Sequence, residues 1–183
     1  MTLTEIANRL KCDKGTEAHE AHGYTEIYES AIRKQCRMLE IGIDRGLSVQ
    51  MWTAWSDDIN LIAIDNRAEV FTTEVRALCD SRICDQSNTS DLEFLAQSIG
   101  TEWLDVIIDD GSHRPDDQML SIEMLWRCLK VGGVYIVEDL HAAAFFPEQL
   151  PIIPRLQEFC ESRQTGIAIA CKNKLALIRK VAT

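Results

Sequence analysis

Two acidic turns in this sequence hold the residues best suited to catalysis. Residues 109–113 are Asp-Asp-Gly-Ser-His and residues 138–141 are Glu-Asp-Leu-His, and each turn directly follows an apolar run. Clustered carboxylates raise one another's pKa unless a cation neutralises them. Several carboxylates suit magnesium or calcium more than zinc. A metal ion there would lower the pKa of a substrate hydroxyl, and a nearby histidine could take the proton.

Each of these signals also has a simpler interpretation. Asp110 and Gly111 could form only a turn, and His141 is more typical of a surface histidine than of a catalytic one. Together, the four carboxylates and two imidazoles are stronger evidence for a site than each residue alone. Neighbouring parallel strands bring their carboxyl ends to one edge of a sheet. We therefore expect a catalytic cleft there.

A glycine turn precedes both acidic turns. Residues 40–48 are Glu-Ile-Gly-Ile-Asp-Arg-Gly-Leu-Ser, with the glycines spaced G-x-x-x-G. A dinucleotide fingerprint needs G-x-G-x-x-G, and Asp44 would repel a pyrophosphate, so a nicotinamide dehydrogenase is disfavoured. The turn suits a ligand with a cationic or neutral group, although two glycines could serve turn geometry alone.

Acids also end the next two predicted strands. Asp65 could accept hydrogen bonds from two ribose hydroxyls, or cap the following helix. Asp85 and Gln86 could bind an adenine edge, or form only a turn. The ordered series indicates a nucleoside ligand without phosphates, for which S-adenosylmethionine is the obvious candidate; its members are Glu40, Gly42, Gly46, Asp65 and Asp85.

Short apolar runs supply the elements that must position these turns. Continuous runs of this length are typical of strands covered on both faces by helices. The runs are 38–43, 61–65, 81–85, 104–109 and 133–138. Between them, residues 68–79 and 116–129 carry apolar side chains at helical spacing. This alternation predicts a parallel, doubly wound sheet.

The two ends of the chain extend this pattern. Helices are expected near 3–11 and 24–35, and another near 151–163. Two later apolar runs, 167–171 and 175–181, are separated by a short polar break that predicts a hairpin. The predicted fold is therefore α/β: a Rossmann-like, doubly wound, seven-stranded sheet, mostly parallel with a C-terminal antiparallel hairpin.

Composition excludes several classes of protein. A chain of 183 residues suggests one domain, and 19 basic against 29 acidic residues give a net charge of −10, which disfavours binding to nucleic acid or to an anionic membrane. No apolar run approaches membrane-spanning length, and the first residues lack a signal-peptide pattern. The seven cysteines contain no C-x-x-C pair. We expect reduced cysteines in a cytoplasmic protein.

On these motifs the sequence resembles the metal-dependent class I S-adenosylmethionine O-methyltransferases of macrolide sugars, the mycinamicin and macrocin type. It also resembles the related cephalosporin-hydroxylase-like methyltransferases. The resemblance spans about residues 13–141. The matching stretches are 13–16 (Asp-Lys-Gly-Thr), 22–24 (His-Gly-Tyr), 39–43 with Gly46 and Ser48, 64–65, 85–87, 108–113 and 137–140.

The resemblance implies a role for most of the candidate residues. It implies magnesium ligation by Asp110, Glu138 and Asp139, with His113 as the base beside Asp110. The predicted cofactor site comprises Tyr24, Glu40, Gly42, Asp44, Ser48, Asp65, Asn66, Asp85, Gln86 and Asp109. The domain is expected to span residues 1–183, with its N-terminal helical segment, 1–36, closing over the cofactor.

The acceptor is less constrained than the cofactor. We expect a small molecule with a reactive hydroxyl, on a sugar or a glycosylated compound. Phe145 and Phe146 could line its pocket, form a lid or only pack, and Trp52 and Trp55 could pack or contact a second copy in a homodimer. The alternatives are a cephalosporin-hydroxylase-like enzyme with another acceptor, and a non-catalytic cofactor-binding partner subunit. The intact acidic turns argue against the second.

Overall fold

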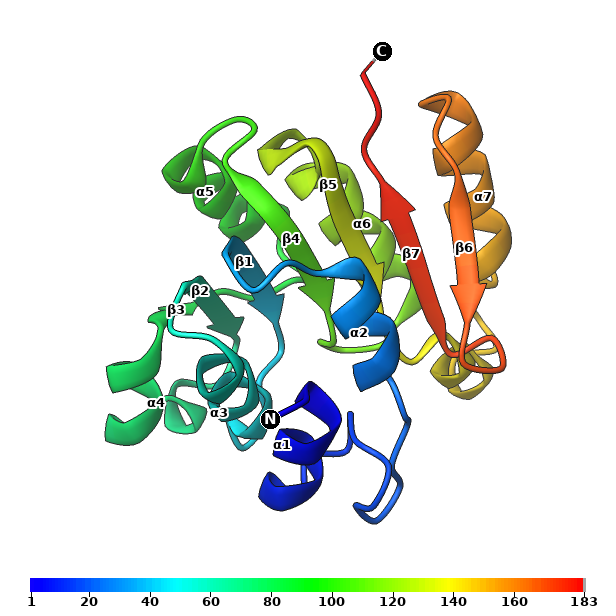
Figure 1. Ribbon diagram of the computed structural model, residues 1–183. Coiled ribbons are helices and arrows are strands. Elements are labelled where there is room, and N and C mark those ends of the chain that lie inside the picture. Colours follow the sequence, from blue (N-terminus) through cyan, green and yellow to red (C-terminus); the bar gives the residue numbers. More distant parts are fainter. Residues whose placement is uncertain (183) are drawn as a thin grey trace.

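A seven-stranded sheet forms the centre of the computed structural model, which describes residues 1–182 (Figure 1). Its strand order is β3-β2-β1-β4-β5-β7-β6. The strands are β1 (Cys36–Ile41), β2 (Ile59–Asp65), β3 (Asp80–Ile83), β4 (Leu104–Asp109), β5 (Leu129–Val137), β6 (Ile167–Ala170) and β7 (Leu175–Arg179). The first five pair in parallel, and β7 is antiparallel to both β5 and β6. The predicted sheet, including its C-terminal hairpin, is confirmed.

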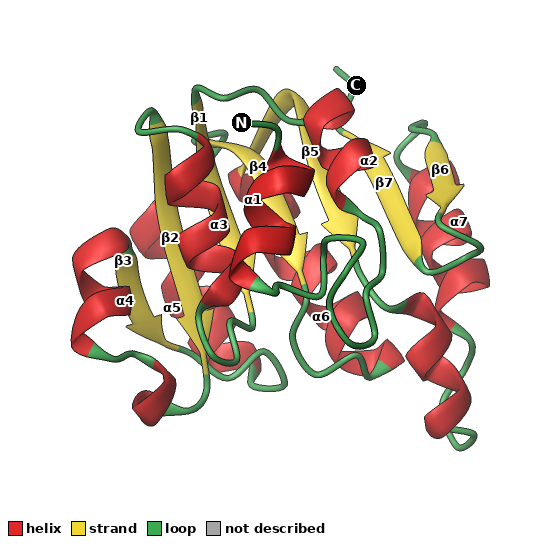
Figure 2. Ribbon diagram, turned by 60° about the horizontal axis from the view of Figure 1, so that its bottom comes forward, coloured by secondary structure: helices red, strands yellow, loops and turns green. Residues whose placement is uncertain are grey.

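Helices cover both faces of this sheet, as the continuous apolar runs require (Figure 2). One apolar core lies beneath α1 (Leu3–Leu10), α2 (Thr25–Ala31), α3 (Leu47–Trp55) and α4 (Thr73–Leu78). The other lies beneath α5 (Thr89–Ile99), α6 (Pro115–Leu125) and α7 (Ile152–Ser162). Short 3₁₀ turns are η1 (Ala68–Val70), η2 (Trp126–Cys128) and η3 (Leu140–Phe145).

Local sequence signals explain where several helices begin. Thr2 and Glu5 form a reciprocal capping box at α1, and the Asn88 side chain accepts from two amides at the start of α5. Pro115 occupies the first turn of α6, where its missing N–H costs nothing. The expected helix over 68–79 is instead split into η1 and α4. Thr72 has an extended backbone and accepts from the amide of Val75, so a new helix begins there.

Strand periodicity decides which way the acids at the sheet edge face. Successive side chains of a strand point to opposite faces. Glu40 therefore faces the same core as Met38 and contacts Trp52 of α3, whereas Asp109 faces the α5 and α6 side. Two predicted carboxylates thus lie on opposite faces of one sheet.

The cysteines and tryptophans are packing residues. All seven cysteines are unpaired, and five of them are buried. Trp52 and Trp55 are buried within the chain against Tyr28 and each other, which supports packing over a contact with a second copy. Within residues 1–182, every helix falls short of the length and apolarity that crossing a membrane would require.

Candidate active site

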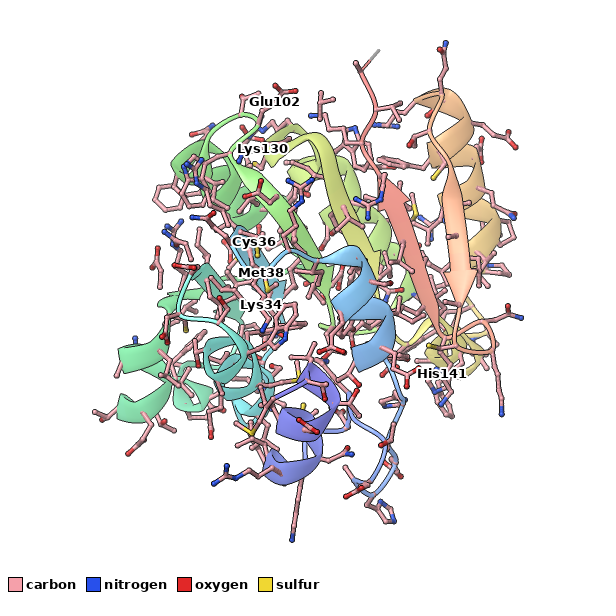
Figure 3. All side chains as sticks on the ribbon, in the orientation of Figure 1. Lys34, Cys36, Met38, Glu102, Lys130 and His141 are labelled. Atoms are coloured by element: carbon pink, nitrogen blue, oxygen red, sulfur yellow. The ribbon has the colours of Figure 1, made fainter. Side chains whose placement is uncertain are left out.

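A cavity of about 1130 Å³ opens at the carboxyl edge of β1, β2 and β4. Figure 3 marks the two edges: Glu102 and Lys130 lie near the amino ends of β4 and β5, and His141 lies near the carboxyl ends. Ten of the predicted site residues line the cavity: Gly42, Asp44, Ser48, Asp65, Asn66, Asp85, Gln86, Asp110, His113 and Asp139. The sheet therefore gathers at one place the turns that the sequence singled out.

Four predicted site residues lie behind the cavity wall instead. Tyr24, Glu40, Asp109 and Glu138 are all at most 1% exposed and do not line the cavity. Direct contact with a ligand stays a prediction for each. His141 also lies outside the lining, with a half-exposed side chain.

The glycine turn lies against the first acidic turn. Gly42 has φ +81°, and a Cβ there would lie 2.3 Å from the carbonyl oxygen of Asp110. The Asp110 amide donates to the carbonyl of Ile41 at 2.9 Å. Asp44, His113 and Asp139 also have positive φ values, a conformation that costs non-glycine residues free energy. Together with Lys11 (φ 57°) and Gly42, left-handed backbone is thus found at five cavity-lining positions.

Asp65 is an acceptor at the floor of the cavity. Its carboxylate accepts from the backbone amides of Ile43 and Arg67, and from the Arg67 guanidinium at 3.1 and 3.3 Å. Burial would raise the pKa of Asp65, but the bonds from Arg67 and Ile43 outweigh it and lower that pKa. Sequence reasoning missed Arg67, which holds the oxygens predicted to bind ribose.

Gln86 and Asp109 form a polar support beneath the first acidic turn. The Gln86 amide group donates to Asp109 and to Ser121, and its oxygen accepts from the Ser112 amide at 2.5 Å. A Cβ on Gly111 would overlap that oxygen, so a larger residue there would displace the Gln86 amide. With its amide satisfied in this way, Gln86 positions residues 109–113 although it also lines the cavity. Asp85 accepts from the amide and hydroxyl of Ser87, as in the turn interpretation.

Glu40 is a buried carboxyl with few interactions that offset the cost of its burial. Its Oε1 accepts from Nε1 of Trp52 at 3.2 Å, while its Oε2 has no hydrogen-bond partner among the described residues. Burial raises the pKa of Glu40 to about 7, although the charge of Lys14 opposes the rise. A buried carboxyl that titrates near neutrality is typical of functional sites.

Three side chains form a candidate metal centre at the ends of β4 and β5. Asp110, His113 and Asp139 each offer a ligand atom, and these atoms lie within 4.8 Å of one another. Nε2 of His113 is 3.9 Å from Oδ2 of Asp139, and its Nδ1 has no partner within residues 1–182. Burial would raise the pKa of Asp139, but Tyr24 and the imidazoles of His22 and His113 lower it overall. Two carboxylates and one imidazole suit a divalent cation.

Lys14 belongs to a stretch that matches the family but was given no role from the sequence, and its side chain contacts this centre. Its Nζ donates to Oδ2 of Asp110 at 2.5 Å and to Oε2 of Glu138 at 2.8 Å. The Tyr28 hydroxyl donates to Oε1 of Glu138, and the Tyr24 hydroxyl donates to Oδ1 of Asp139 at 2.6 Å. Both oxygens of Glu138, a predicted metal ligand, are therefore engaged by the N-terminal segment.

Comparison with known proteins gives the cavity a context. No protein-family model matches the chain. It is 32% identical over 150 residues to L-olivosyl-oleandolide 3-O-methyltransferase of Streptomyces antibioticus, covering 75% of this chain and 36% of that protein. It is 29% identical over 140 residues to a tetracenomycin-C rhamnosyl 2'-O-methyltransferase of Streptomyces olivaceus, covering 70% and 36%.

A solved structure fixes the fold. The MycE methyltransferase of the mycinamycin biosynthetic pathway, in complex with Mg and SAH, superimposes with a TM-score of 0.83 at 21% identity, over 99% of this chain and 55% of MycE. This chain has the class I methyltransferase fold. The predicted resemblance to macrolide-sugar O-methyltransferases is confirmed as similarity in sequence and fold. The chain spans about a third of the length of those curated relatives.

Proposed function

We propose that this chain is an S-adenosylmethionine-dependent, magnesium-assisted O-methyltransferase acting on a hydroxyl of a sugar or glycosylated small molecule. One observation carries the proposal: a single cavity joins the glycine turn and the Asp65 floor to Asp110, His113 and Asp139. The sequence relatives named as sugar O-methyltransferases support it.

The cofactor fits the part of the cavity formed by β1 and β2. Gly42 lets the backbone of the two turns approach closely, and Asp44 and Asp65 supply carboxylates suited to a sulfonium ligand and its ribose. Ser48, Asn66 and Asp85 line the same wall. Ribose binding at Asp65 requires Arg67 to move aside or to share the carboxylate.

The metal fits the other part of the cavity. Asp110 and Asp139 provide the hard oxygen ligands that magnesium prefers, and His113 stands beside them. A magnesium ion bound there would lower the pKa of an acceptor hydroxyl. We propose the predicted set of Asp110, Glu138 and Asp139 as ligands, although ligation by Glu138 requires Lys14 or Tyr28 to release an oxygen.

The chain's own contribution is to orient the acceptor and accept its proton. As the acceptor oxygen bonds to the methyl carbon and the carbon–sulfur bond breaks, the hydroxyl proton passes to the His113 imidazole. The Asp139 carboxylate, 3.9 Å from Nε2, stabilises the imidazolium. Alignment of oxygen, methyl carbon and sulfur is the largest expected effect.

The N-terminal segment, 1–36, completes this proposal. Its residues Lys11, Lys14 and His19 line the cavity opposite the sheet edge, which supports a role in covering the cofactor. We propose one domain over residues 1–183, a small-molecule acceptor, a homodimeric assembly and a cytoplasmic location. The net charge of −10 favours a small-molecule acceptor over a nucleic acid.

Two measurements test the proposal. S-adenosylhomocysteine should raise the melting temperature, because a ligand that binds only the native state stabilises it. Absence of a shift at ligand concentrations far above micromolar would exclude the cofactor. A methyl-transfer screen over glycosides and phenols, with and without a chelator, then tests the acceptor class and the metal.

His113→Ala separates the proposed base from a structural residue. We expect loss of methyl transfer by about 10²–10⁴-fold with unchanged affinity for S-adenosylhomocysteine and for Mn²⁺. Loss of Mn²⁺ affinity as well would make His113 a metal ligand. Loss of all three would make it structural.

A further inference from the structure

Lys14 is the one buried cation among residues 1–182, with 1% of its surface exposed. Burial alone would lower the pKa of Lys14, but Asp110 and Glu138 outweigh burial and raise that pKa well above its usual range. Its Nζ lies 2.5 Å from Oδ2 of Asp110 and 2.8 Å from Oε2 of Glu138, the contacts of an ammonium charge paired with two carboxylates. This charge lies between two carboxylates that the proposed function assigns to a metal ion.

The carboxylates around Lys14 need this charge. Glu138 has only 1% of its side chain exposed and Asp110 has 21%, so water solvates their charges only in part. Glu40 lies near the same group and is likewise buried. Carboxylates placed this close together and away from water are costly unless a cation is paired with them.

The backbone of Lys14 joins this charge to the N-terminal segment. The carbonyl oxygen of Lys14 accepts from the amides of Tyr24 and Thr25, at 2.9 and 3.2 Å. The side chains of Tyr24 and Tyr28, just beyond, bind Asp139 and Glu138. Every carboxylate of the proposed metal set is thus bonded to a residue between positions 14 and 28.

We infer that Lys14 is a built-in cation of the metal centre: it holds Asp110 and Glu138 in place before a metal ion binds, and it competes with that ion for their oxygens. Lys14 is on this view a positioning residue that couples metal binding to the N-terminal segment. The inference rests on the metal part of the proposed function. It predicts that removing Lys14 makes the fold less stable while making metal binding tighter.

The experiment compares Lys14→Met with the matched control Lys11→Met. Lys11 is an exposed lysine on the same cavity wall, so its replacement removes an equal charge from the same neighbourhood. Mn²⁺ serves as the probe, and isothermal titration gives its affinity. We expect Lys14→Met to bind Mn²⁺ at least about tenfold more tightly than wild type, and Lys11→Met to change it by less than about threefold.

Stability provides the second measurement. Without metal, Lys14→Met should melt about 10 °C below wild type, because it leaves buried carboxylates unpaired. Saturating Mn²⁺ should then raise its melting temperature by more than it raises that of wild type. A purely structural lysine would lower stability without tightening Mn²⁺ binding, so unchanged or weaker binding overturns the inference.

A double variant covers the case in which Lys14→Met does not fold. Lys14→Met/Glu138→Gln removes one charge of each sign, and we expect it to fold and to melt well above Lys14→Met. Failure of that rescue overturns the inference. Titration of S-adenosylhomocysteine into the wild-type protein tests the proposed function separately, because that ligand can bind whether or not Lys14 competes with a metal.

Discussion

Replacing Glu40 with glutamine should change how stability depends on pH. Glu40 is fully buried on the face of β1 that packs against α3, with one hydrogen bond, from Trp52. Burial raises its pKa to about 7 from an ordinary value of 4.5. In the unfolded chain the carboxyl ionises at its ordinary pKa, so between these two values the folded state binds more protons than the unfolded state.

The sign and size of the effect follow from this difference. Where the folded state binds more protons, the free energy of unfolding falls as pH rises. The rise from 4.5 to about 7, at about 1.36 kcal/mol per pKa unit, corresponds to about 3 kcal/mol. Below about pH 4 this loss of unfolding free energy is absent, and above about pH 8 it is complete. Glu40→Gln removes the titration and should not show this loss.

Urea denaturation at a series of pH values measures the effect. The free energy of unfolding of Glu40→Gln minus that of wild type should rise by about 3 kcal/mol between about pH 4 and pH 8. Titrating groups that do not interact with Glu40, including the buried Asp109, cancel in this difference. Glu123→Gln, at an exposed position on α6, is the control and should give a flat difference. A flat difference for Glu40→Gln as well would refute the reasoning.

Two further substitutions test the glycine turn and the ribose site. Gly42→Ala should destabilise the fold by about 3 kcal/mol in urea denaturation, because the Cβ would meet the Asp110 carbonyl and φ is +81°. Gly132→Ala, with a similar φ of +83° but open space, should cost only about 1–2 kcal/mol; equal losses would exclude the steric contact. Arg67→Ala should tighten S-adenosylhomocysteine binding about fivefold, because it removes the half-exposed guanidinium that occupies the Asp65 carboxylate. Weaker binding, measured by titration calorimetry, would show that Arg67 contacts the cofactor itself.

The strands were predictable because each is a short apolar run buried on both faces. Every predicted strand matches an observed one, with differences of a few residues at the ends. The break in the helix expected over 68–79 was not predictable from apolar spacing. That spacing continues across Thr72, whose side chain starts a new helix. A capping bond between neighbouring residues outweighed periodicity there.

The site was predictable to the extent that strand ends determine it. Ten of the predicted residues line one cavity because they follow the carboxyl ends of neighbouring strands. Strand periodicity, applied to the same runs, also distinguishes Glu40 from Asp109, whose side chains face opposite layers. Lys14 was out of reach of such reasoning, because its partners are 96 and 124 residues away and no period links them.

The acids that contribute to the net charge of −10 lie in different environments. At the sheet edge, acids are separated by depth: Asp44 and Asp85 line the open cavity, while Glu40 and Glu138 are buried. Exposed carboxylates are screened by water, whereas buried ones need a proton or a cation. Lys14 supplies that cation for Glu138. For Glu40, the charge of Lys14 offsets the effect of burial only in part. We therefore expect replacement of Lys14 to affect Glu138 more than Glu40.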